Sequence, residues 1–513
     1  MPVEHPDTAQ VERMAAEFGL GIDAADIATY QAVTQGLLQS WNKVEDLYED
    51  LAPTAPVRAW SRPEDSDNPW GAWYVQTDLT ETQEGPLAGR TVAIKDNIAV
   101  AGVPMMNGSW TVEGFVPSED ATVVRRLLAS GGTILGKAVC EDLCFSGGSH
   151  TSRTGPVRNP WDPTRSAGGS SSGSAALVAA GLVDLAVGGD QGGSVRIPAS
   201  FCGVVGHKPT FGLVPYTGAF PIEQSIDHLG PITRTVTDAA AMLAVLAGVD
   251  GLDPRQPDAI TSVDYVRALS QSPAGLRVGV VAEGFGHANS DPEVDSAVRA
   301  AAKTLSDQGL LVDDVSIPWH SYGPAIWDVI SVEGATWQMV DGNAYGLNWK
   351  GYYDPELIAY YGESWRRDPS RFSETVKLVA LAGRHALGTE YGRHYAMARS
   401  LAARLTAAYD AALATFDVLV MPTVPIRASL LPGPGAPLDE VLGRALEMLA
   451  NTAPFDVTGH PACSVPADMV GGLPVGLMVI GKKFDDATVL RVAHALETAV
   501  GGFPLPTAER RSA

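Results

Sequence analysis

Cysteine is scarce in this chain, with four residues among 513, at positions 140, 144, 202 and 463. So few and so scattered cysteines exclude a scaffold built on disulfides. Cys140 and Cys144 have no second pair and no suitably spaced histidine nearby, which argues against zinc. The sequence therefore indicates four buried, reduced thiols and no metal or other cofactor. A cysteine nucleophile stays open, but no histidine partner can be assigned to it.

Long apolar runs are also missing. The longest, about residues 175–187, is interrupted by Gly181 and Asp184 and is too short to cross a bilayer. The sequence opens on Met1-Pro2-Val3-Glu4-His5, without the basic and apolar stretches of a secretory leader. We therefore expect no membrane association and a cytoplasmic location.

Positive charge is the third shortage. Lys and Arg number 36 against 59 Asp and Glu, which gives a formal net charge of −23. An acidic surface repels phosphate backbones, so nucleic acid is not expected as a direct ligand. The apolar fraction of 45% and the charged fraction of 19% are typical of a globular protein. A small neutral or cationic ligand fits this charge better.

Two regions of different pattern divide the chain. Apolar residues recur at helical spacing through residues 8–50, and a proline-rich stretch with Pro53, Pro56, Pro63 and Pro69 follows. We expect an N-terminal helical domain over residues 1–80. It either caps the rest of the chain or provides the face through which a homodimer forms.

From residue 85 short β-branched runs alternate with helical segments. Strands are predicted at 91–94, 133–135, 183–187, 276–281, 418–421 and 474–480, and helices at 121–129 and 174–180. Strands become rare between about 330 and 410. The pattern predicts an α/β fold with a central mixed, twisted sheet covered by helices. Its main domain comprises residues 81–330 and 411–513, and residues 331–410 form a small helical insertion.

One glycine-rich loop follows a predicted strand directly. Residues 188–198 read Gly-Gly-Asp-Gln-Gly-Gly-Ser-Val-Arg-Ile-Pro. Consecutive glycines let several backbone N–H groups point one way, which creates an anion pocket beside Ser194. Acyl transfer needs this pairing of an attacking hydroxyl with donors for an oxyanion. Taken alone, the loop is explained better by a structural glycine turn with an incidental serine.

A second loop, residues 166–174, reads Ser-Ala-Gly-Gly-Ser-Ser-Ser-Gly-Ser and leads into a predicted helix. Its hydroxyls could simply cap that helix. Residues 169–173 also match the G-x-S-x-G nucleophile elbow, which requires a preceding strand. We discount the match because residues 159–165 are predicted to be coil.

Lys95 closes the predicted strand that contains Val92-Ala93-Ile94. The four residues mimic the kinase strand V-A-I-K, but no glycine loop precedes them and no kinase catalytic loop follows. A lysine in this place either extends its amine to solvent or has a function.

Lys95, Ser170 and Ser194 together, and nearly all of residues 168–198, resemble the amidase signature family. Family-like segments also occur at 137–149, 201–210, 227–234 and 451–477, so the resemblance covers about residues 85–505. The segment before residue 80 and residues 212–221 are similar to actinobacterial amidases that act after nitrile hydratase. One departure is Ser172, where the family often has glycine.

The resemblance implies an enzyme that hydrolyses small aliphatic or aromatic carboxylic amides to carboxylate and ammonia. Lys95 would be the base, Ser170 the proton relay and Ser194 the nucleophile that forms an acyl-enzyme. A lysine acts as a base only when it is neutral, and burial favours that form. The peptide bond between Gly169 and Ser170 is expected to be cis. The oxyanion hole would consist of the backbone N–H groups of Gln191, Gly192, Gly193 and Ser194.

Further residues receive supporting roles from the same resemblance. Asp190 and Arg196 flank the nucleophile loop and are expected to brace it as an ion pair, with Ser171 as a further support. An apolar acyl pocket would be lined by Phe145, Ile226 and Trp327, although plain core packing explains each of these three equally well.

Three other functions stay open. The leaving group cannot be read from the sequence, so an aryl acylamidase or a carbamate hydrolase is one alternative. The A subunit of a tRNA-dependent amidotransferase shares the same catalytic motif, but that protein needs partner subunits and an ammonia channel. A non-catalytic scaffold with this fold is the third, and the three intact catalytic positions argue against it.

Overall fold

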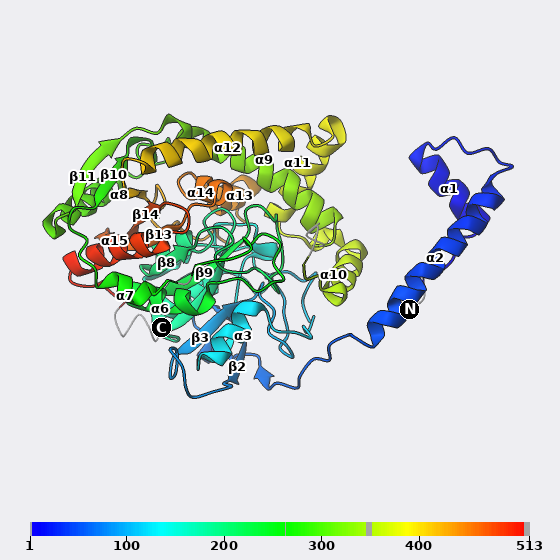
Figure 1. Cartoon of the computed structure of the whole chain (residues 1–513), viewed down its shortest axis with the longest axis horizontal. Coiled ribbons are helices and arrows are strands. Elements are labelled where there is room, and N and C mark those ends of the chain that lie inside the picture. Colours follow the sequence, from blue (N-terminus) through cyan, green and yellow to red (C-terminus); the bar gives the residue numbers. More distant parts are fainter. Residues whose placement is uncertain (1–2, 262, 345–350, 507–513) are drawn as a thin grey trace. The chain divides into compact units, whose positions relative to one another are not determined.

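The computed structural model describes residues 3–261, 263–344 and 351–506. The chain forms two compact units, Met1–Ala55 and Pro56–Ala513 (Figure 1). The smaller unit is a pair of helices, α1 (Thr8–Phe18) and α2 (Ile27–Glu49), as the periodicity predicted. Asp7 begins α1 with a capping box that it forms with Gln10, which satisfies two free N–H groups of the first turn.

The boundary between the units differs from the predicted one at residue 80. Residues 56–80 belong to the larger unit because β1 (Trp60–Ser61) and β2 (Trp73–Leu79) pair into its sheet. The proline-rich composition of this stretch concealed a strand whose first three residues are buried. Residues 1–2, 262, 345–350 and 507–513, which fall within the predicted domains, lie outside the described part of the chain.

A mixed sheet of twelve strands forms the centre of the larger unit, in the order β1-β2-β4-β3-β7-β9-β8-β13-β14-β12-β10-β11. Its remaining strands are β3 (Thr91–Lys95), β4 (Thr133–Ala138), β7 (Leu185–Asp190), β8 (Val205–Lys208), β9 (His228–Thr233), β10 (Arg277–Val281), β11 (Leu311–Val315), β12 (Val418–Pro422), β13 (Ala462–Val470) and β14 (Leu473–Gly481).

The pairing of β3 decides where the site lies. This strand runs parallel to β4 on one side and to β7 on the other. The carboxyl ends of parallel neighbours meet at one edge of a sheet, so Lys95 at the end of β3 lies close to the loop that follows Asp190 at the end of β7. Both strands are buried almost throughout, which explains their continuous apolar sequence.

Helices cover the sheet and contact one another in groups. One group joins α3, α6, α7, α8 and α15, and another joins α9, α11, α12 and α14 along the top of the view in Figure 1. Their bounds are α3 (Thr122–Ala129), α4 (Ser172–Ala180), α5 (Arg196–Cys202), α6 (Val236–Leu246), α7 (Tyr265–Leu269), α8 (Pro292–Thr304), α9 (Gly323–Ala335), α10 (Pro355–Arg367), α11 (Glu374–Glu390), α12 (Arg393–Leu413), α13 (Leu438–Leu446), α14 (Ala453–Thr458) and α15 (Asp486–Ala499).

The predicted insertion at 331–410 is helical where the structure describes it, but it is not a separate unit. Its first helix, α9, begins before residue 331, and its last, α12, continues past residue 410. Both pack against α14 from the C-terminal part of the chain. The insertion therefore shares its core with the rest of the larger unit, and α9 brings Trp327 toward the glycine loop.

One local prediction was wrong. Residues 159–165, predicted to be coil, contain parts of β5 (Arg158–Asn159) and β6 (Asp162–Ser166), which form a two-stranded sheet of their own. β6 ends at Ser166, and Gly168 with a positive φ separates it from Ser170, so the strand does not run straight into a helix as an elbow would. Within the described residues no helix is both long and apolar enough to cross a membrane.

Candidate active site

The loop between β7 and α5 carries Ser194. Asp190, the last residue of β7, accepts hydrogen bonds from the N–H of Gly193 at 2.7 Å and of Val195 at 3.0 Å. The Asp190 carboxylate therefore holds both ends of the loop together and fixes its backbone conformation. The Ser194 side chain lies within this turn, at the point where the chain enters α5, and is only 7% exposed.

Arg196 holds that carboxylate in place. The guanidinium is fully buried and donates to both oxygens of Asp190, at 3.0 and 2.9 Å. Burial alone would raise the pKa of Asp190, but the Arg196 charge outweighs it and holds this pKa well below its usual range. The predicted bracing ion pair is therefore present, in the bidentate form that suits arginine.

Asp456 is a third member of this buried cluster, and the sequence analysis missed it. Its Oδ2 accepts from Arg196 Nη2 at 2.8 Å. Burial and the neighbouring Asp190 charge raise the pKa of Asp456 well above its usual range. Asp190 and Asp456 thus share one buried guanidinium, whose positive charge offsets part of the cost of burying two carboxyl groups. Asp456 lies in the family-like segment 451–477, and this resemblance was the signal that could have identified it from the sequence.

Lys95 and Ser170 meet beside the nucleophile loop. Lys95 Nζ lies 2.8 Å from Ser170 Oγ and 3.2 Å from the carbonyl oxygen of Gly189, and both side chains are fully buried. The peptide bond between Gly169 and Ser170 is cis, as the resemblance implied. The lysine at the strand end therefore does not extend to solvent, and its amine lies against the relay hydroxyl.

Ser171 links the two loops. Its N–H donates to the carbonyl of Ser194 at 3.2 Å. Its hydroxyl donates to the carbonyl of Gly189 at 3.0 Å and accepts from the N–H of the same residue at 3.2 Å. These bonds hold the segment of Ser170 against the segment of Ser194, as the predicted supporting role requires.

Two buried lysines in this region differ in their partners. Lys137 Nζ lies 2.9 Å from Asp96 Oδ1. Lys95 forms no ion pair with any carboxylate in the described residues. Lys137 therefore has a buried carboxylate as its partner, whereas Lys95 contacts the Ser170 hydroxyl and a backbone carbonyl.

The four predicted oxyanion donors are not equivalent. The N–H of Gly193 donates to Asp190 and is not available to an oxyanion, so the prediction was wrong for this residue. The carbonyl of Gln191 accepts from the Trp327 indole N–H at 2.6 Å. Since the C=O and N–H of one peptide point in opposite directions, this contact turns the Gly192 N–H away from Trp327. The N–H groups of Gln191, Gly192 and Ser194 remain as donors.

Glycine is required at two places in this loop. A Cβ on Gly192 would lie 2.6 Å from the Trp327 ring, and a Cβ on Gly193 would lie 2.3 Å from Thr452 Oγ1. Gly193 also has a φ of +131°, which other residues rarely adopt. The same threonine donates to the Gly192 carbonyl at 2.6 Å. Trp327 and Thr452 thus pack against the loop and hold the carbonyls of Gln191 and Gly192 by hydrogen bonds.

A cavity opens directly at Ser194, and its empty space of about 370 Å³ includes the solvent at its mouth. All three predicted pocket residues line it, and the rings of Phe145 and Trp327 stack with centroids 6.5 Å apart. Its lining also includes apolar side chains that no motif indicated: Ile222, Leu446 and Leu449. An apolar chamber with a hydroxyl and N–H donors at one wall suits a small acyl group.

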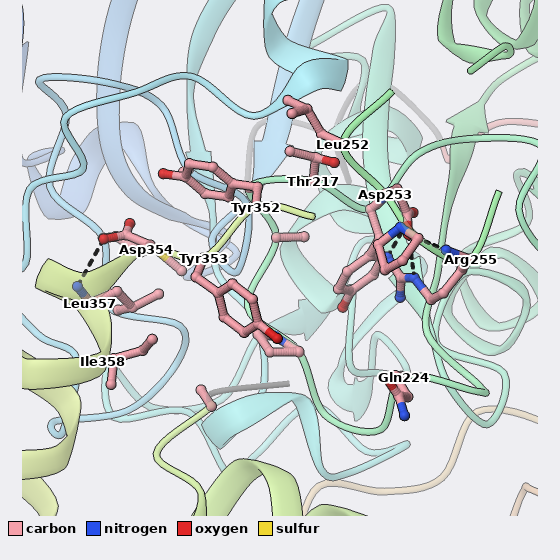
Figure 2. Close-up of a pocket in the computed structure, with 18 of the residues that line it drawn as sticks. Thr217, Gln224, Leu252, Asp253, Arg255, Tyr352, Tyr353, Asp354, Leu357 and Ile358 are labelled. Carbon is pink, nitrogen blue, oxygen red and sulfur yellow. Dashed lines mark hydrogen bonds and ion pairs between the residues drawn. The ribbon is translucent and has the colours of Figure 1, made fainter. Parts of the chain in front are cut away.

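A second cavity, of about 760 Å³, shares no lining residue with the first (Figure 2). Figure 2 shows Arg255 paired with Asp253 at its wall, where Arg255 Nε lies 2.7 Å from Asp253 Oδ1. Tyr216 lines this cavity and accepts a hydrogen bond from Gln191 Nε2 at 3.0 Å. None of the three predicted catalytic side chains reaches it. In the described part of the chain no three His, Cys, Asp or Glu side chains are grouped so that they could hold a metal ion.

Comparison with known proteins agrees with this geometry. The chain matches the Amidase family over residues 66–490. It is 56% identical over 505 residues to an enantioselective amidase from Rhodococcus rhodochrous, a match that covers 98% of this chain and 97% of that protein. The A chain of the glutamyl-tRNA(Gln) amidotransferase from Exiguobacterium sibiricum is 39% identical over 435 residues, 84% of this chain and 88% of the relative.

Solved structures give the same result for the fold. The native peptide amidase from Stenotrophomonas maltophilia superposes with a TM-score of 0.68 at 30% identity, covering 83% of this chain and 85% of that one. The predicted α/β fold, with its mixed sheet covered by helices, is confirmed, as is the prediction of an enzyme that hydrolyses amides. On its sequence and on its structure, the chain belongs to the amidase family.

Proposed function

We propose that this chain hydrolyses small carboxylic amides with a free NH2 group to carboxylate and ammonia, through an acyl-enzyme on Ser194. The observation that supports this most strongly is the buried contact between Lys95 Nζ and Ser170 Oγ, which lies beside the loop that carries Ser194. A hydroxyl, a buried amine and free backbone donors are what acyl transfer from an amide requires.

The first half of the reaction forms the acyl-enzyme. Neutral Lys95 accepts a proton from Ser170, which in turn accepts the proton of Ser194, and Ser194 Oγ attacks the amide carbonyl carbon. The negative oxygen is stabilised by the N–H groups of Gln191, Gly192 and Ser194. When the C–N bond breaks, the relay returns a proton to the nitrogen, and ammonia leaves.

Water completes the cycle. It loses a proton to the same relay, attacks the acyl carbon and releases the carboxylate, which restores the hydroxyl of Ser194. The cavity wall of Phe145, Ile226 and Trp327 would hold the acyl group during both steps and exclude bulk water from it.

The alternatives are less well supported. The match to the enantioselective amidase covers nearly the whole chain, including the N-terminal unit, whereas the match to the amidotransferase A chain leaves part of the sequence uncovered. This favours an amidase that acts alone over a member of a tRNA-dependent amidotransferase complex. Aryl acylamidase or carbamate hydrolase activity differs only in the leaving group, and the lining of the cavity does not discriminate between them.

The test is a panel of amides offered to the purified chain alone, with ammonia as the readout. We expect turnover of aliphatic and aromatic primary amides without any partner protein, and the panel should include both enantiomers of a chiral amide. Turnover restricted to anilides or carbamates would show that the chain is an aryl acylamidase or a carbamate hydrolase instead. A chain that is inert until other proteins are added would contradict it.

We also propose that the chain forms a homodimer through α2. One face of this helix carries apolar side chains spaced three or four residues apart, each more than half exposed: Tyr30, Val33, Leu37, Trp41, Val44 and Leu47. This spacing places them in one stripe along the helix. Only Val11 and Ile27 are buried within the two helices of the unit, so the unit has little core of its own. A second copy of the same stripe would cover it.

Charge on the stripe should separate the dimer. We expect Leu37→Glu to give monomers in sedimentation or light-scattering measurements, with amide hydrolysis retained because the catalytic cavity lies in the larger unit. Gln39→Glu adds the same charge about half a turn away and should leave the dimer intact. A wild-type monomer at micromolar concentration would refute the proposal.

The cysteines and the N-terminal unit bear on the compartment of the enzyme and on the origin of its substrates. All four cysteines are free and buried, which fits a reducing compartment, and we propose the cytoplasm. Because the N-terminal unit resembles that of amidases that act after nitrile hydratase, we also propose that its amide substrates arise from nitriles.

A further inference from the structure

The cavity at Ser194 contains a second nucleophile that amide hydrolysis does not use. Cys144 lines this cavity, on the same wall as Phe145. It is 5% exposed, comparable with Ser194 at 7%. The other three cysteines are fully buried and do not line the cavity. A reagent that enters the cavity therefore meets one thiol of the four.

The surroundings of Cys144 activate its thiol. Cys144 Sγ and Cys140 Sγ both donate to Asn107 Oδ1, at 3.3 and 3.5 Å. Burial alone would raise the pKa of the Cys144 thiol, but the neighbouring Cys140 thiol and the Lys95 amine, while it carries its proton, outweigh burial and lower this pKa to about 7. Burial raises the pKa of Cys140, Cys202 and Cys463 well above the usual range. Thiolate is the reactive form, so Cys144 alone is prepared for attack.

A polar group in the same cavity selects the class of ligand. Gln191 lines the cavity, is 4% exposed and leaves its Oε1 without a hydrogen-bond partner in the described residues. An unpaired buried acceptor favours a ligand that brings a donor. The NH2 group of a primary amide is such a donor, and the apolar wall opposite accepts the rest of the molecule.

We propose that Cys144 is a covalent modification site for small primary amides that carry an electrophilic carbon, such as α-halo amides. The thiolate attacks the carbon that bears the halogen, an S–C bond forms, and the C–halogen bond breaks. Halide leaves with the electron pair, and the thiol proton passes to water. The resulting thioether fills the cavity and blocks access to Ser194. The inference rests on the proposed function only in that the cavity admits small amides.

The direct test treats the whole chain with 2-chloroacetamide and follows each cysteine by peptide mass spectrometry. We expect a carbamoylmethyl group on Cys144 at least about tenfold faster than on the other three cysteines. Hydrolysis of a simple amide should fall in step with this adduct, and that amide, present in excess, should slow its formation. Equal labelling of all four cysteines, or an unmodified Cys144, would overturn the proposal.

Three variants make the result specific. Cys202→Ser, the matched control, should still be inactivated, since this thiol is fully buried, does not line the cavity and does not contact Cys144. The activity of Cys144→Ser should be insensitive to 2-chloroacetamide. Ser194→Ala should still acquire the adduct on Cys144, and loss of the adduct in this variant would contradict the assignment. Hydrolysis without alkylation refutes this inference alone, and alkylation without hydrolysis refutes the proposed function alone.

Discussion

Replacing Ser194 with alanine is expected to lower kcat for amide hydrolysis by at least about 10⁴-fold, because the variant removes the hydroxyl that lies in the loop of backbone N–H donors. Folding should be almost unaffected, since the variant removes one oxygen that faces a cavity. Ammonia release and the thermal midpoint, measured on the same preparation, test the two halves of this expectation.

The matched control lies six residues further on. Ser200 lies in α5, the helix that follows the Ser194 loop, and is buried, but it does not line the cavity, and its hydroxyl has no partner among the described residues. Ser200→Ala should therefore retain most of the activity. If Ser194→Ala and Ser200→Ala behave alike, the assignment of the nucleophile is wrong.

Lys95→Met should have the second largest effect, a loss of about 10²–10⁴-fold in kcat, because the variant removes the base and keeps the volume. Hydrolysis by the wild type should increase from neutral toward alkaline pH, because the relay ends on a base that must accept a proton. This dependence should disappear in the residual activity of the variant. A wild-type profile that peaks in the acidic range would contradict a lysine base.

Lys137→Met separates catalysis from stability. Lys95 has no carboxylate partner in the part of the chain that the structure describes, so its loss should change the free energy of unfolding by only about 1–2 kcal/mol. Lys137 pairs with Asp96 at 2.9 Å, and its loss leaves a buried carboxylate alone, at a cost of about 3–5 kcal/mol. In denaturant unfolding, Lys137→Met should therefore be less stable than Lys95→Met. The reverse order would indicate that Lys95 is the structural lysine.

Much of the site could be predicted because its residues cluster in short motifs. Asp190, Ser194 and Arg196 lie within seven positions, and the glycines between them allow only a tight loop at a strand end. Lys95 ends a strand whose buried sequence is unmistakable, and parallel pairing with β7 then brings it to the same sheet edge. Local sequence located these residues, and the family resemblance assigned their roles.

The remaining parts depend on contacts between distant segments. Asp456 and Thr452 approach the loop from more than 250 residues away in the chain, and no local pattern shows that one pairs with Arg196 and the other with the Gly192 carbonyl. The use of the Gly193 N–H by Asp190 is likewise a matter of backbone direction, which composition does not report. The strand β2 was hidden by its proline-rich surroundings.

The central claim is that Ser194 carries the acyl group, and one measurement tests it most directly. The chain is mixed with an activated benzoyl ester, whose acyl-enzyme accumulates because its leaving group departs quickly, and the reaction is quenched in acid for peptide mass spectrometry. The account predicts one benzoyl group on the peptide that contains Ser194, formed before steady turnover. Steady turnover without that label, or a benzoyl group on Cys144 instead, would contradict it.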